Sequence, residues 1–504
     1  MSQEFKKKGN TRGGQRESRR AIQQVNHQET FLHTVCNLAI PVALQSMLQS
    51  SFSIVDQIMI GQLGSVNVAA VGLAGKFSSI FSVVVAAVGT VAGIMISQYL
   101  GQRNKKEVRR SFYVNMIVAV LIAVGFTVLC AGCPEMIMGI YTKDSPTIKT
   151  AGSYLAIVAW TFLPMAGATM LSTLFRCMEK AQFPLYASIL AAILNTGLNY
   201  ILIFGKFGFA PMGAEGAAVA TLISQLANFM LMFGAILWHG DVLRGERPAG
   251  TTSEAGVANA AGETGTAGAA NAAGETSATC AAVVARFNWQ QYLGILLPIL
   301  ICEFLWSLGE NVYAAIYGHL GTESSAAMTL INPVQGLMIG ALSGLSQAAG
   351  VIIGKKLGNN EYDEAYESSK KLILYGFVGS AVLSVVIILS RSWYVEIYQV
   401  EESVKALTCQ ILLAYALVAP FKVLNMILGG GIISSGGKTK YVMVIDMIGT
   451  WGFGVPLGMI SAFVLKLSIP YVYFILSLEE CVRFMISVVV FRKRGWMQSL
   501  ESGE

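Results

Sequence analysis

The side chains best suited to chemistry in this sequence are ionisable residues inside long apolar runs. Five stand out, namely Asp56, Glu303, Glu310, Asp446 and Lys422. On insertion scales a charged side chain at the centre of a bilayer costs about 2.5–3.5 kcal/mol, so in a membrane span such a residue is a functional candidate. Buried carboxylates bind cations or exchange protons. The first expectation is therefore cation or proton chemistry.

Asp56 lies fifteen residues after Pro41 in the same apolar run. A proline removes one backbone hydrogen bond and can kink a helix. We therefore expect protonation of Asp56, or Na⁺ binding to it, to be coupled to bending at Pro41. The alternative is that Asp56 lies near the outer end of its helix and only contacts water.

Amide and hydroxyl groups in two other apolar runs are candidate partners of Asp56. Asn195 and Asn199 are four residues apart and so share one helix face. Their amides are suited to ligating a cation or hydrogen-bonding Asp56, and Thr221 adds a hydroxyl. The alternative is a purely structural role, because Asn and Thr commonly bond neighbouring membrane helices to each other.

A second group of carboxylates lies in the C-terminal half. Glu303 and Glu310 are seven residues apart, and two helical turns return them to nearly the same face. We expect Asp446 to join them from another helix. Carboxylates close together in a low-dielectric cavity disfavour each other's charged form, which suits proton uptake and release.

The same carboxylates would attract organic cations into a substrate cavity. Tyr313 and Tyr317 follow Glu310 closely and offer cation–π contacts. The alternative is a fixed ion pair between these acids and Lys422 or Arg483. Arg176 is assigned a structural role at a helix end.

The elements that must position these residues are membrane-spanning helices. Hydrophobic residues make up 54% of the 504-residue chain and charged residues 13%, about half the 25% usual in soluble domains. Twelve apolar runs are too long for strands. They cover 33–60, 67–99, 111–133, 151–175, 184–205, 216–238, 292–317, 325–353, 372–390, 407–433, 441–465 and 470–491. The predicted class is an all-α polytopic membrane protein.

The basic residues predict the orientation. With the N-terminus inside, the cytoplasmic segments hold 26 Lys and Arg residues and the outer loops hold 6. Positive charge is enriched in cytoplasmic loops, so both termini are expected in the cytoplasm and the chain in the plasma membrane. The basic residues form no continuous face for nucleic acid.

The chain contains an internal repeat. Shifted by 257 residues, 41–101 matches 298–358 with 15 identities in 61 positions. Pro41 falls on Pro298, which makes the two prolines corresponding helix hinges. Six spans per half give a parallel repeat, hence two pseudo-symmetric six-helix bundles that rock against each other.

Composition divides the chain further. The expected parts are a disordered cytoplasmic tail at 1–30, an N-terminal lobe at 31–240, an Ala/Gly-rich flexible linker at 241–290, a C-terminal lobe at 291–492 and a short cytoplasmic tail at 493–504. The linker contains ANAAGET twice, and its low complexity favours a flexible segment.

Several motifs resemble the multidrug and toxic compound extrusion (MATE) family. The stretch from Pro41 to Arg110 contains VDQIMIGQLG at 55–64 and QYLG at 98–101. GAEGAAVAT at 213–221 is similar to the family's entry into its sixth helix, and IYGHLG at 316–321 repeats the first motif. The resemblance covers about 33–500 except the linker.

The resemblance implies an antiporter that expels organic, often cationic compounds in exchange for Na⁺ or H⁺. It also implies that Asp56 and Pro41 belong to the coupling site. One archaeal branch of the family has a second aspartate where this chain has Asn199. Its two-carboxylate proton relay therefore does not carry over.

No enzyme signature, Walker lysine loop or metal-ligand spacing is visible in the sequence, and no cofactor or obligatory protein partner is expected. The expected partners are the lipid bilayer and small organic cations. One alternative is a lipid-linked saccharide flippase of the same wider superfamily, for which a cationic cavity would be favoured. A membrane receptor or intramembrane enzyme is an alternative of another class.

Overall fold

The structure is a computed structural model that describes residues 31–51, 55–56, 58–63, 65–141, 144–239, 287–398 and 401–500. The predicted N-terminal tail and almost all of the predicted linker lie outside these residues. The described residues form helices joined by short connections, and no strand occurs among them. The predicted all-α class is confirmed.

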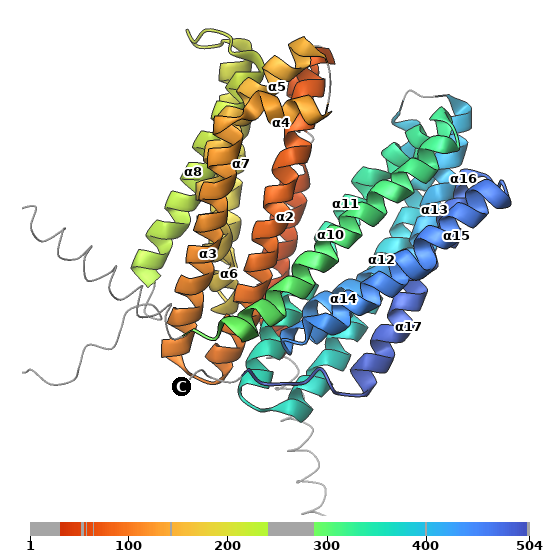
Figure 1. The fold of residues 1–504 in the computed structure, drawn as a ribbon. Helices are drawn as coiled ribbons and strands as arrows, with labels where there is room; N and C mark the ends of the chain where they lie inside the picture. Colours follow the sequence, from red (N-terminus) through yellow and green to blue (C-terminus); the bar gives the residue numbers. More distant parts are fainter. Residues whose placement is uncertain are drawn as a thin grey trace, which may run out of the picture.

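The helices form two bundles that stand side by side (Figure 1). The first bundle contains an opening helix, Phe31–Ser51, followed by α2 Ser65–Gly101, α3 Lys105–Gly132, α4 Pro134–Tyr141, α5 Ser145–Val158, the 3₁₀ turn η1 Ala159–Thr161, α6 Phe162–Cys177, α7 Gln182–Phe204 and α8 Gly213–His239. Helix α5, η1 and α6 together make one membrane-spanning length, Ser145–Cys177.

The second bundle repeats this order. It contains α10 Trp289–His319, α11 Thr322–Gly358, α12 Tyr362–Glu396, α13 Glu402–Asn425 continued by η2 Met426–Ile433, then α14 Thr439–Met447, η3 Ile448–Gly454, α15 Val455–Met459, η4 Ile460–Val464, α16 Ile469–Ser477 and α17 Glu479–Arg492. Eleven of the described helices are long and apolar enough to cross a membrane. The predicted span 470–491 corresponds to α16 and α17, which meet at Leu478.

Two of the C-terminal spans contain π-helical turns. Pro420 lies inside α13, and the following segment η2 contains Gly429, Gly430 and Gly431. A side chain at Gly431 would meet the backbone of Ser346, so glycine is what lets η2 pack closely on α11. Pi-turns inside helices are often found at functional sites, and η2 borders the cavity described below.

The two bundles touch most closely where α2 crosses α11. A Cβ atom at Gly101 would overlap the carbonyl oxygen of Lys355, and one at Gly358 would overlap the carbonyl oxygen of Gln98. Gly101 lies 257 residues before Gly358, and Gln98 lies 257 residues before Lys355. The two contacts are therefore related by the internal repeat. The crossing is therefore a pseudo-twofold contact that only glycine permits.

This end of the molecule is closed, whereas the bundles diverge toward the other end (Figure 1). Lys355 pairs with Glu179 across the bundles at 2.6 Å. The segment after α17 also crosses from the second bundle to the first, where the Gln98 side chain accepts a hydrogen bond from the Leu500 backbone N–H at 2.6 Å. We call residues 495–500 the C-terminal strap.

Candidate functional site

A polar cluster lies inside the N-terminal bundle. Asn199 on α7 donates a hydrogen bond to Asp56 at 2.8 Å and a second to Asn195 at 3.2 Å. The Asn195 amide lies 3.4 Å from the hydroxyl of Thr221 and 3.3 Å from that of Ser224. Asn199 and Ser224 are buried. The structure thus brings Asp56, Asn195, Asn199 and Thr221 into one cluster.

Two buried polar atoms on α7 lack hydrogen-bond partners among the described residues. The side-chain oxygen of Asn199 is buried and has no hydrogen-bond partner among the described residues, and the same holds for the Thr196 hydroxyl. With its amide turned over, Asn195 would place its nitrogen 3.0 Å from both carboxylate oxygens of Asp56. The cluster therefore has one spare oxygen, that of Asn199, on a side chain that bonds the carboxylate of Asp56.

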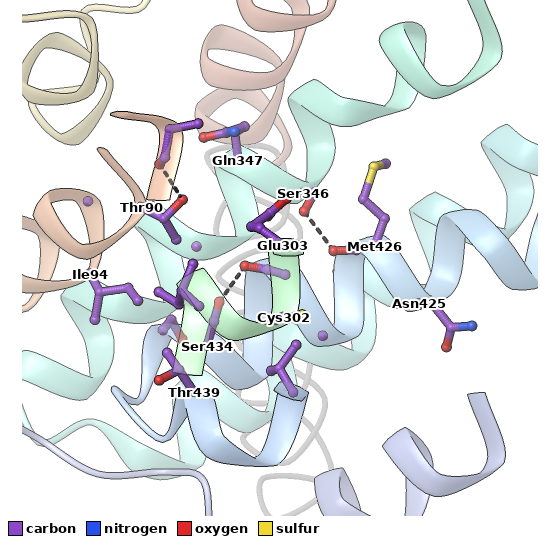
Figure 2. Close-up of a pocket in the computed structure, with 18 of the residues that line it drawn as sticks. Thr90, Ile94, Cys302, Glu303, Ser346, Gln347, Asn425, Met426, Ser434 and Thr439 are labelled. Atoms are coloured by element: carbon purple, nitrogen blue, oxygen red, sulfur yellow. Dashed lines mark hydrogen bonds between the residues drawn. The ribbon is translucent and has the colours of Figure 1, made fainter. Parts of the chain in front are cut away.

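A large cavity lies between the two bundles. Its volume is about 680 Å³, and its walls come from α2 and α6 on one side and from α10, α11, α13, η2, α14 and α17 on the other. Figure 2 shows residues that line it, with Glu303 and Gln347 on its wall. A volume of this size suits a drug-sized organic molecule.

Glu303 is the acid of this cavity that has no fixed partner. Its side chain is half-buried, and the described residues make no hydrogen bond or ion pair with it. It lies on α10, whose first turn is capped by the Asn288 side chain accepting from the Gln291 N–H at 3.0 Å. The buried Pro298 lies one turn and a half before Glu303 and also lines the cavity.

Asp446 lines the same cavity but is held by neighbours. It accepts a hydrogen bond from the Cys302 thiol at 2.8 Å and forms an ion pair with Arg483 at 3.6 Å. Arg483 also pairs with Glu479 at 3.8 Å and bonds the Thr450 hydroxyl. Asp446 therefore belongs to a fixed network, as the ion-pair alternative proposed.

Glu310 borders a second, smaller cavity of about 360 Å³ inside the C-terminal bundle. Tyr313 and Tyr317, both buried, line this cavity too. Tyr313 donates a hydrogen bond to Glu479 at 2.6 Å. The structure thus separates Glu303 and Glu310, which border different cavities, because seven residues span about 10 Å along a helix axis.

Sequence reasoning missed the acids of the last helix. Glu479 and Glu480 begin α17 and are buried, and Asn425 donates to the Glu480 carboxylate at 2.9 Å. Together with Arg483 they place three charged residues within five positions of a predicted span. So many charged residues close together in a predicted span could have identified this segment from the sequence, since ionisable residues in spans are functional candidates.

Lys422 connects the two cavities. It borders both, as does Glu480, and the described residues form no ion pair with it.

Pro41, the predicted counterpart of Pro298, lies within the opening helix Phe31–Ser51. Among the described residues no group of three or more His, Cys, Asp or Glu side chains is arranged as a metal site.

Two lobes of membrane-spanning helices around a central cavity define this chain as a polytopic membrane transporter. A model of the MatE family matches residues 41–201 and 298–460, one stretch in each lobe. The chain belongs to the MATE family of multidrug efflux transporters. The family is one of transporters and not of enzymes.

Curated relatives match almost the whole chain. It is 22% identical to the uncharacterized transporter YisQ of Bacillus subtilis over 92% of this chain and 94% of the relative. It is 24% identical to the multidrug resistance protein MdtK of Yersinia enterocolitica, with 84% and 85% covered. It is 23% identical to the probable multidrug resistance protein NorM of Brucella suis, with 88% of each chain covered.

Solved structures share the fold. One is the outward-facing conformation of a multidrug resistance MATE family transporter, with a TM-score of 0.77 and 16% identity over 92% of this chain and 95% of that one. Another is the MATE transporter VcmN of Vibrio cholerae, with a TM-score of 0.78 and 13% identity over 93% and 99%.

Proposed function

We propose that this protein exports organic, cationic compounds across the plasma membrane in exchange for H⁺ or Na⁺. One observation carries the proposal: the 680 Å³ cavity between the lobes presents Glu303, a carboxylate without a fixed partner among the described residues. In a low-dielectric site such a group attracts a cation strongly. The multidrug resistance proteins among the relatives favour export over the flippase alternative.

The Asp56 cluster is proposed as the coupling site. A proton or Na⁺ on Asp56 would neutralise a carboxylate that now accepts a hydrogen bond from Asn199. The carboxylate and the unpartnered oxygen of Asn199 are the hard oxygen ligands that Na⁺ prefers. Either ion would change the hydrogen bond between Asn199 on α7 and Asp56, which follows the opening helix in the sequence, and this offers a route to bending at Pro41.

We propose that transport proceeds by rocking of the lobes, 31–240 against 291–492, with Pro41 and Pro298 as hinges. The excess of Lys and Arg at the closed end supports a cytoplasmic position for that end and for both termini. The conformation described above then faces outward. The proposed roles of Glu310, Tyr313 and Tyr317 are to hold the cationic part of a substrate. Asp446 is proposed to take part in cation or proton coupling, in which its ion pair with Arg483 would be broken.

Everted membrane vesicles test the proposal. Vesicles from cells that express the protein would be loaded to give a proton gradient or a Na⁺ gradient separately, and uptake of the cationic dye rhodamine 123 would be followed. We expect one gradient to drive uptake, and Asp56→Asn and Glu303→Gln each to abolish it. Asp363→Asn changes an exposed aspartate at the surface and serves as the matched control.

Gradient-driven uptake that persists in both Asp56→Asn and Glu303→Gln would refute the site assignment. Absence of uptake with either gradient in the wild type would refute cation export itself.

A further inference from the structure

The cavity between the lobes carries as many basic as acidic side chains. The acids are Glu303, Asp446 and Glu480, and the bases are Arg176, Lys422 and Arg483. A site for simple cations would be expected to carry acids in excess. The equal numbers suggest a ligand that has both signs of charge.

Part of this charge is already neutralised within the protein. Asp446 and Arg483 form an ion pair at 3.6 Å, and Asn425 bonds the carboxylate of Glu480. The Asn425 amide is neutral, so Glu480 keeps its charge. Glu303, Lys422 and Arg176 also form no ion pair with the described residues.

Of these four groups only Arg176 belongs to the N-terminal lobe. Glu303 is the acid that also lacks a hydrogen bond from the described residues, so a ligand between the lobes would bridge Glu303 and Arg176. These two groups come from different lobes, Glu303 from α10 and Arg176 from α6.

Arg176 is held in position by neutral groups only. Its guanidinium donates to the Ser172 carbonyl at 3.3 Å, to the Ser172 hydroxyl at 3.1 Å and to the Gln347 side-chain oxygen at 3.1 Å. These hydrogen bonds hold the half-buried guanidinium in place, but no carboxylate among the described residues pairs with its charge. Its planar fork is suited to a carboxylate or a similar anion, which it can bind with two hydrogen bonds.

We propose that the cavity selects zwitterionic organic molecules, with the cationic group at Glu303 and an acidic group at Arg176. The inference deepens the proposed function and rests on it. A ligand bound in this way contacts both lobes at once, because α6 and α10 belong to different bundles. Arg176 is then a specificity-determining residue that distinguishes a zwitterion from a plain cation.

Two dyes that differ by one methyl ester test this inference. Rhodamine 123 is a cationic ester, and rhodamine 110, its free acid, carries a carboxylate as well. Both would be titrated against the purified full-length protein by fluorescence anisotropy, and uptake of both would be measured in the everted vesicles. One additional buried ion pair predicts about tenfold tighter binding of rhodamine 110, equivalent to 1.4 kcal/mol.

Variants separate the charge of Arg176 from its structural contacts. Arg176→Gln should abolish the preference, because it should weaken rhodamine 110 binding about tenfold more than rhodamine 123 binding. Arg176→Lys should restore part of the preference. Gln347→Ala removes the hydrogen bond between the lobes but keeps the guanidinium, so the preference should persist.

Wild-type protein that exports rhodamine 123 but binds rhodamine 110 no more tightly would overturn the inference and leave cation export standing. An undiminished preference in Arg176→Gln would also overturn it. If the vesicles export neither dye, the proposed function fails and this inference fails with it.

Discussion

Arg483 is the residue around which the buried charges of the C-terminal lobe are organised. It is 7% exposed and reaches Asp446, Glu479 and Thr450. Three elements, α14, η3 and α17, are joined through this one side chain. Removing it would leave two carboxylates in the interior without a compensating cation.

We therefore expect Arg483→Ala to destabilise the protein by about 3–5 kcal/mol, because breaking a buried ion pair leaves uncompensated charge. Thermal unfolding of the detergent-purified protein measures the loss. Lys370→Ala is the control, because the ion pair between Lys370 and Glu367 is exposed at the surface and is worth at most about 1 kcal/mol. Equal melting temperatures for Arg483→Ala and the wild type would contradict the expectation.

At the scale of elements, the crossing of α2 and α11 sets how closely the lobes approach. Gly358 lies against the carbonyl oxygen of Gln98, where no Cβ atom fits. A backbone oxygen cannot rotate out of the way as a side chain can. The closed end therefore depends on this glycine and on its repeat partner, Gly101.

Gly358→Ala should push the lobes apart at this end. The measurement is the rate of cross-linking by a short bis-maleimide between cysteines placed at 179 and 355, where the Lys355 Nζ and the Glu179 Oε1 now lie 2.6 Å apart. We expect a clear fall in the rate in a background without native cysteines. Gly318→Ala is the matched control, since a Cβ atom at Gly318 meets nothing within 4 Å. The same rate in both variants would show that the crossing tolerates a side chain.

The C-terminal strap is a second element at the closed end. Gln98 on α2 donates to the Ser435 carbonyl at 2.5 Å and accepts from Leu500 at 2.6 Å, and Gln102 donates to the Leu500 carbonyl at 2.9 Å. The buried Trp496 anchors the strap in the C-terminal lobe. The strap thus ties the two lobes together on one side of the cavity.

Removing the strap's anchor points should favour opening of this end. We expect Gln98→Ala to increase the access of an impermeant thiol reagent, added to everted vesicles so that it meets only the cytoplasmic face, to a cysteine placed at Ser434, which lines the cavity. Gln45→Ala removes a hydrogen bond that lies within the N-terminal lobe, from Gln45 to Ser188, and serves as the control. Unchanged access in Gln98→Ala would mean that the strap does not hold the closed state.

For the whole molecule, the orientation in the membrane is the property to test first. Ser145 is exposed at the start of α5, at the end where the lobes diverge, and Asp363 is exposed near the closed end. Each cysteine would be introduced into a variant from which the native cysteines have been removed. In intact cells that express these variants, an impermeant maleimide should label Ser145→Cys and not Asp363→Cys. The reverse pattern would place the termini outside and overturn the direction of transport.

Much of the fold could be predicted because its determinants are local in the sequence. The runs 292–317 and 372–390 predict helices by length and composition alone, and α10 and α12 contain them. The span 470–491 was predicted as one helix but is divided at Leu478, next to Glu479 and Glu480. Local hydropathy does not report such a break.

The candidate site was less predictable, since its contacts join helices far apart in the chain. Asp56 and Asn199 were expected as partners and lie 2.8 Å apart. Arg176 was expected at a helix end with a structural role, and it does lie in the last turn of α6. Only the tertiary structure shows that it also borders the cavity between the lobes. Nothing in its neighbouring residues indicates that α11 of the other lobe lies opposite.

The sequence by itself determined the all-α membrane class, the repeat and the resemblance to the MATE family, because apolar length, charge and motif are properties of single segments. Only the tertiary structure decided that Glu303 and Glu310 border different cavities and that Arg483 holds Asp446. These relations depend on how each helix is rotated and packed against distant neighbours. That rotation is set by packing and backbone contacts between lobes, such as Gly358 on Gln98, which no single segment encodes.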